Sequence, residues 1–188
     1  MNSTDIIQRA LLLPNGARFY RCALQVNPFD YIQRHSTTES YPDETSYNEA
    51  IVRACLENEI EVIAITDHYR VKTAETLIAA VKAAGIIVFP GFEAVTKDGV
   101  HLLCLFDQTR HLEEINRIIG DCGIHDYANS SPTGDLDVSE LLREATGKWN
   151  AICIAAHVAS EDGLLRKLTG LSAINAWKCD DLLAWSFP

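Results

Sequence analysis

The sequence predicts an α/β fold built around a largely parallel β-sheet. Short apolar runs rich in β-branched residues occupy 61–66, 86–91, 100–106 and 151–156, and turn-forming residues bound them. Segments of helical period separate several of these runs, which is the element order of a parallel sheet. Polar residues lie at the ends of the runs. In parallel α/β folds the carboxyl ends of the strands meet on one face, where functional sites are built.

Length and composition favour one domain over residues 1–188, because the chain is 47% apolar and can bury a single core. The formal net charge of −10 argues against an autonomous nucleic-acid binder. Nucleic acid is still possible as a substrate, since bound metals and a partner domain can supply positive charge. The six cysteines form no Cys-x-x-Cys pair, which favours reduced thiols in a cytoplasmic protein. The apolar stretch 6–13 contains Gln8 and Arg9, so we expect neither a signal peptide nor a membrane span.

In the first half of the chain, helices are expected where a capping residue precedes an apolar period and Gly or Pro follows it. Strands are expected where short apolar runs lie between turn residues. In order, the expected elements are a helix over 5–12, a strand over 19–26, a long polar loop over 27–46, a helix from Thr45 or Ser46 to Glu57, a strand over 62–66, and a helix over 73–84 closed by Gly85.

The second half begins with a strand over 86–89, which we expect to continue over 92–95 after a break at Pro90-Gly91. Asp98-Gly99 then predicts a turn into a return strand. The remaining elements follow the same signals. They are a strand over 100–106, a helix over 112–119, a polar loop over 121–137, a helix over 138–145, a strand over 151–156, a helix over 163–168 and a strand over 182–187.

Glu93, His101 and His157 form the strongest candidate metal-ligand set. Two imidazoles and one carboxylate suit zinc, manganese or iron. Glu93 and His101 flank the expected hairpin, so they can lie close in space. The alternative for His101 is a partly exposed strand histidine. A carboxylate directly after an apolar strand, such as Glu93, is costly to bury unless it is paired or bound to a metal.

Asp67-His68 ends the strand over 62–66, and His68 is a further candidate ligand. Asp67 can accept the second ring N–H of the histidine or hold the loop. Alternatively, it can cap the next helix. His35 and Asp30, in the polar loop over 27–46, could each complete a site with His68, or could be solvated loop residues.

Four short motifs together resemble the PHP (polymerase and histidinol phosphatase) domain, over about residues 20–157. They are A-I-T-D-H at 64–68, G-F-E-A at 91–94, V-H-L-L at 100–103 and A-A-H-V at 155–158. The resemblance implies a distorted (β/α)7 TIM-like barrel, incomplete in this chain, that hydrolyses phosphodiesters or phosphomonoesters with divalent metals at its C-terminal rim. It implies metal ligands at His68, Glu93, His101 and His157, and catalytic roles for Asp67, His68 and Glu93.

Two departures from the family pattern concern the number of metal ions. The family opens with Asp-Leu-His-x-His, whereas this chain has Gln25 and Asn27 at the two histidine positions. Amides are weak neutral ligands, so we expect fewer than three ions of manganese, zinc or iron. The closing Asp-x-His motif has no match, so the chain is a fragment or lacks that motif.

The amino-acid sequence of residues 19–26 also resembles that of PHP domains fused N-terminally to SMC- or AAA-like ATPases. Some of those proteins are linked to bacterial antiviral defence. That resemblance implies an ATPase domain or subunit as partner, oligomerisation through it, and a cytoplasmic location away from membranes. Three functions follow as hypotheses. The first is a nuclease-like metal-dependent phosphoesterase, the second is a catalytically inactive scaffold or regulatory domain, and the third is a metal-binding sensor that gates an attached ATPase.

Overall fold

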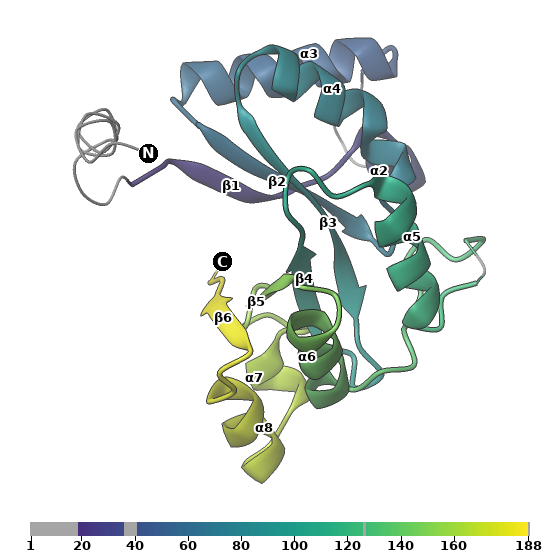
Figure 1. Ribbon diagram of the computed structural model, residues 1–188, viewed down its shortest axis with the longest axis vertical. Coiled ribbons are helices and arrows are strands. Elements are labelled where there is room, and N and C mark those ends of the chain that lie inside the picture. Colours follow the sequence, from purple (N-terminus) through teal and green to yellow (C-terminus); the bar gives the residue numbers. More distant parts are fainter. Residues whose placement is uncertain (1–18, 36–40, 126, 188) are drawn as a thin grey trace, which may run out of the picture.

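In the part of the chain that the structure describes, six strands form one curled sheet, and their spatial order follows the sequence (Figure 1). The computed structural model describes residues 19–35, 41–125 and 127–187, so the helix expected over 5–12 lies outside the described residues. The strands are β1 (Cys22–Val26), β2 (Val62–His68), β3 (Ile87–Val95), β4 (His101–Leu105), β5 (Ile152–Ala155) and β6 (Leu182–Trp185). A curled open sheet of this kind is consistent with the incomplete TIM-like barrel expected from the sequence.

The sheet is mixed, because β4 runs antiparallel to both of its neighbours while the pairs β1–β2, β2–β3 and β5–β6 are parallel. The tight connection after Val95 causes this reversal, since a short turn can join only antiparallel strands. As a result, the carboxyl ends of β2, β3 and β5 and the amino end of β4 lie on one rim of the sheet.

Helices flank the curled sheet at both ends of the molecule (Figure 1). Helices α3 (Glu44–Glu57) and α4 (Glu75–Ala83) lie beside the first three strands, and α6 (Val138–Gly147) packs near β5. The other helices are α2 (Phe29–Arg34), the 3₁₀ turn η1 (Lys72–Ala74), α5 (Leu112–Asp121), α7 (Leu164–Lys167) and α8 (Gly170–Trp177). Among the described residues, no helix is long and apolar enough to cross a membrane.

The prediction of one long loop over 27–46 was wrong, because α2 forms within it. Pro28 precedes the helix with extended backbone geometry, and Arg34 pairs with Asp30 one turn earlier at 2.7 Å. The expected cap of α3 was also wrong. Asp43, rather than Thr45 or Ser46, accepts a hydrogen bond from the Ser46 N–H and so caps this helix.

The expected break at Pro90-Gly91 does not occur, and β3 is continuous. Pro90 lacks an N–H, but its carbonyl accepts a hydrogen bond from the Phe106 N–H at 2.9 Å. Gly91 is required here because an added Cβ would lie 2.4 Å from the Cys104 carbonyl oxygen. Helix α8 was not expected at all, and β6 ends at Trp185 rather than Phe187.

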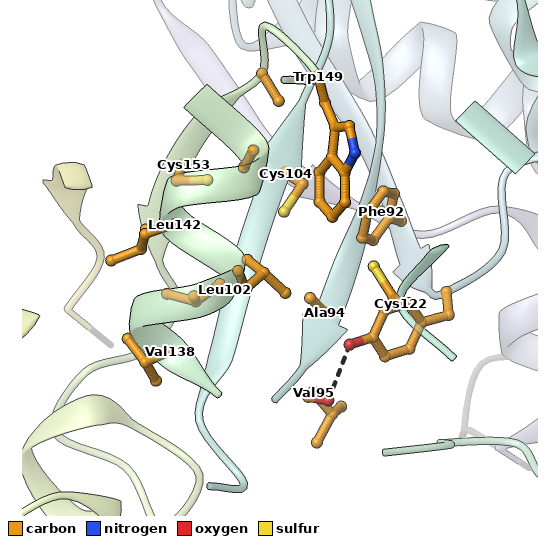
Figure 2. Close-up of a cluster of buried hydrophobic side chains, with 14 of the residues drawn as sticks. Phe92, Ala94, Val95, Leu102, Cys104, Cys122, Val138, Leu142, Trp149 and Cys153 are labelled. Carbon is orange, nitrogen blue, oxygen red and sulfur yellow. Dashed lines mark hydrogen bonds between the residues drawn. The ribbon is translucent and has the colours of Figure 1, made fainter. Parts of the chain in front are cut away.

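The largest core cluster lies between β3, β4 and β5 and the helices α5 and α6 (Figure 2). Phe92 is fully buried there, and its ring lies 5.5 Å from that of Tyr69 and 5.9 Å from that of Phe106. The Tyr69 hydroxyl donates to the Val95 carbonyl at 2.9 Å, which satisfies its buried polar atom. Burial raises the pKa of the Cys122 thiol to about 12, so this cysteine is an inert core residue. This packing holds the strand that carries Glu93.

Candidate metal centre

Four side chains converge on the rim where β2, β3 and β5 end and β4 begins. The parallel register places His68 directly beside Glu93 on the neighbouring strand. The β3–β4 hairpin pairs Val95 with His101, so His101 enters the same rim from the opposite direction. His157 follows β5, whose last residues run beside the start of β4. The backbone of His157 has a positive φ of 29°, a conformation that non-glycine residues rarely adopt.

Glu93 lies between two imidazoles. Its Oε1 atom lies 2.7 Å from Nδ1 of His101, and its Oε2 atom lies 3.6 Å from Nε2 of His68. One ligand atom from each of these three residues lies within 4.8 Å of the other two. His157 adjoins this triad, with its ring centroid 5.1 Å from that of His101. All four residues that the sequence indicated as ligands lie at this rim, but the compact triad contains His68 in place of His157, which belonged to the strongest predicted set.

The surroundings of these side chains favour the ionised carboxylate and the neutral imidazoles that a cation needs. Burial alone would raise the pKa of Glu93. The hydrogen bond with His101 and the nearby His68 have a larger combined effect in the other direction, so the pKa of Glu93 lies below its usual value. Burial also lowers the pKa of His68 and of His157, with Glu93 opposing the shift in both. Neutral histidine and ionised glutamate are the ligand forms that metals bind.

The residues present fit a divalent cation. Nε2 of His68 is buried and has no hydrogen-bond partner among the described residues, although a buried polar atom normally has one. This atom faces the carboxylate of Glu93 across 3.6 Å, a separation over which two ligands can share one ion. A set of two histidines and one carboxylate suits zinc, manganese or iron, as expected from the sequence.

Asp67 holds the backbone of the rim rather than the ring of His68. Its Oδ1 atom accepts a hydrogen bond from the His68 main-chain N–H at 2.7 Å, and its Oδ2 atom accepts one from Arg34. Burial raises the pKa of Asp67, and the Arg34 guanidinium opposes this shift. Asp67 does not cap the next helical turn, because Val71 is the residue that precedes that turn. Its two oxygens contact the His68 main chain and Arg34, so the structure supports a role in holding the loop.

The two lower-ranked candidates lie close to the cluster but differ in their contacts. The ring of His35 lies 6.0 Å from that of His68 and stacks on Tyr31 at 4.2 Å. Asp30 instead accepts a hydrogen bond from Nε of Arg34 at 2.7 Å, so its carboxylate is engaged with the guanidinium.

The two positions that depart from the family pattern also lie at this rim. Nε2 of Gln25 donates to Oε2 of Glu93 at 2.8 Å. The backbone carbonyl of Asn27 accepts a hydrogen bond from the Tyr47 hydroxyl, while its buried Oδ1 has no hydrogen-bond partner within the described part of the chain. Gln25 therefore contributes a hydrogen bond to the carboxylate.

Sequence reasoning missed two residues of this site. Arg34 contacts Asp67, and Oγ of Ser131 lies 3.3 Å from Nδ1 of His68. Neither residue follows an apolar strand, so strand-end patterning carries no signal for them.

The affinity for Zn²⁺ is expected to fall only below the pH at which a free histidine titrates, about 6.5, because protons compete with the metal for the imidazole ligands. His68 and His157 have lowered pKa values, so both stay neutral to a lower pH than a free histidine does. Chelator competition across this pH range measures the profile. A steep loss of affinity already above neutral pH would contradict the lowered pKa values.

Comparison with known proteins supports the fold. No protein-family model matches the chain, and no curated protein matches it. A protein from Bifidobacterium adolescentis assigned as a metal-dependent phosphoesterase aligns with a TM-score of 0.56 at 14% identity, covering 91% of this chain and 78% of that one. The lesion-specific endonuclease Q from Pyrococcus furiosus aligns with a TM-score of 0.58 at 13% identity, covering 88% of this chain. Endonuclease Q bound to a 27-mer duplex with an abasic lesion gives 0.59 at 13% identity, covering 88% of this chain.

This chain spans about two fifths of the endonuclease Q chains, 41% and 42% of their lengths. At this level of identity the likeness shows a shared fold. It supports the α/β fold that the sequence predicted.

Proposed function

We propose that this chain is a PHP-type domain that binds a divalent cation and hydrolyses phosphoester bonds. The observation that carries the proposal is the largely buried cluster of His68, Glu93 and His101, in which Nε2 of His68 has no hydrogen-bond partner among the described residues. The fold shared with a metal-dependent phosphoesterase and a lesion-specific endonuclease supports the same reaction class.

Each residue has a distinct role in this proposal. His68, Glu93 and His101 hold the cation, and His157 completes the set from the adjoining strand end. A bound cation would polarise a phosphoryl oxygen and lower the pKa of an attacking water. Asp67 fixes the main chain at His68, and the Gln25 amide fixes one oxygen of Glu93. These contacts preorganise the ligands before the cation binds.

A second candidate function is a catalytically inactive scaffold or regulatory domain attached to an ATPase of a cytoplasmic defence protein. The Gln25 contact favours it, because an amide occupies one oxygen of Glu93 and so limits the number of ions that this carboxylate can bind. A two-metal mechanism needs ions roughly 3.5–4 Å apart. A domain that binds one ion without hydrolysis could act as a sensor for the attached ATPase.

The metal content of the purified protein, measured by plasma mass spectrometry, is the first test. We expect about one equivalent of zinc, manganese or iron in the wild type, since four ligands suffice for one such ion. This metal should be lost in His157→Ala and kept in His111→Ala, a matched change at an exposed histidine. Hydrolysis of DNA, RNA and a phosphomonoester by the metal-loaded protein then separates the two functions. Absence of metal after reconstitution would refute the enzymatic proposal.

A further inference from the structure

Arg34 carries a charged side chain that is only 15% exposed and lies beside the candidate metal centre. A buried guanidinium is costly unless its donors are satisfied. We propose that Arg34 is a positioning residue of the metal centre, which fixes His68 by holding Asp67 on one side and the Ser130–Ser131 segment on the other. This inference rests on the proposed cation site.

The first route runs through the main chain. Nη2 of Arg34 donates to Oδ2 of Asp67, and the other oxygen of Asp67 accepts from the His68 N–H at 2.7 Å. The carboxylate is therefore held between a guanidinium and the backbone of the ligand. This arrangement fixes where β2 ends and where the His68 side chain starts.

The second route runs through the imidazole ring. Nη1 of Arg34 donates to the Ser130 carbonyl at 2.8 Å, which ties this segment to the rim from 96 residues away in the sequence. Oγ of the next residue, Ser131, lies 3.3 Å from Nδ1 of His68. A partner on Nδ1 sets the ring so that Nε2 faces Glu93, and such partners orient metal-binding histidines.

The third nitrogen of the guanidinium, Nε, anchors the Arg34 side chain itself. Its Nε atom donates to Asp30 at 2.7 Å within α2, and Nη1 also lies 3.4 Å from Nε2 of His35. Nε, Nη1 and Nη2 each donate a hydrogen bond, so the guanidinium connects α2, β2 and the segment 127–135. We therefore do not expect it to bind substrate as a free cation. A lysine presents one point charge and cannot reproduce this arrangement of donors.

The test compares Zn²⁺ affinity, measured by chelator competition, in Arg34→Lys, Ser131→Ala and the double variant. Both single variants are expected to lose about 10–100-fold in affinity, the range found when partners of metal ligands are removed. The double variant should lose less than the product of the single losses, because Arg34→Lys already releases the segment that carries Ser131 and the two changes therefore share the second route. The visible absorption of bound Co²⁺ should also change, since it reports ligand geometry.

Arg110→Ala is the matched control, because Arg110 lies away from the site. Its Nε atom forms an ion pair with Glu114 at 2.9 Å. It should bind Zn²⁺ as the wild type does. Ser131→Ala leaves the Arg34–Asp67 pair intact, so the test remains valid if changes at Arg34 impair folding. Wild-type affinity in both Arg34→Lys and Ser131→Ala would overturn the inference, even if the thermal midpoint of metal-free Arg34→Lys falls. A wild-type protein that binds no Zn²⁺ would instead refute the proposed function itself.

Discussion

Replacing Glu93 with glutamine is expected to abolish cation binding and to lower phosphoester hydrolysis by more than about 100-fold, the upper range for residues that merely support a ligand. Glu93 is the one carboxylate in the three-residue cluster, and it is only 3% exposed. Its two oxygens accept from Gln25 and His101, and the hydrogen bond with His101 helps to keep its pKa low. Glutamine preserves the shape, but it removes the charge and one acceptor oxygen.

Metal content and initial hydrolysis rates of Glu93→Gln provide the measurement. Glu113→Gln is the matched control, because Glu113 is exposed and lies away from the cluster. It forms an ion pair with Lys72 at 2.9 Å. The control should keep both the metal and the activity. If Glu93→Gln retained a full equivalent of metal, the ion would have to lie elsewhere, and the assignment of this cluster would fail.

The strand-end part of the site could be predicted because it depends on local patterns. Apolar runs locate the strands, and a buried sheet specifies its register strongly. That register pairs His68 with Glu93, and the short turn after β3 brings His101 back to the same carboxylate. Each juxtaposition needs only one strand pairing, so a sequence reading can reach it.

The supporting residues could not be predicted in this way. Arg34 lies 33 residues from Asp67 and 96 from Ser130, and no sequence period links these positions. Helix α2 is only six residues long and has no fully buried residue, so its sequence resembles that of a polar loop. Tertiary contacts with Asp67 and Ser130 stabilise the end of this helix, and such contacts become visible only in the folded chain.

The Gln25 position shows how a departure from a family pattern acquires a physical meaning. The sequence indicated a weakened ligand, because an amide replaces a histidine. In the structure, the amide donates to Oε2 of Glu93, so a hydrogen bond stabilises the carboxylate at this position. The amide therefore supports the orientation of the Glu93 carboxylate.

Truncating Phe92 to alanine is expected to lower the free energy of unfolding by about 3–5 kcal/mol, the usual cost of emptying a buried aromatic site. Phe92 is fully buried between the rings of Tyr69 and Phe106, and it directly precedes Glu93 (Figure 2). Urea unfolding measures the change, with Phe187→Ala as the control, because Phe187 is 62% exposed. A loss below about 1 kcal/mol in Phe92→Ala would contradict the packing described here.

The same variant connects the core to the metal centre. A ligand that binds only the folded state stabilises it, by about 2.7 kcal/mol at 100 times its dissociation constant. Zn²⁺ at that excess should therefore restore much of the stability that Phe92→Ala loses, provided that the centre still assembles. It should stabilise Glu93→Gln hardly at all, since that variant lacks the carboxylate ligand. Equal stabilisation of both variants by Zn²⁺ would show that the ion binds outside the cluster, and this comparison tests the site without any assay of activity.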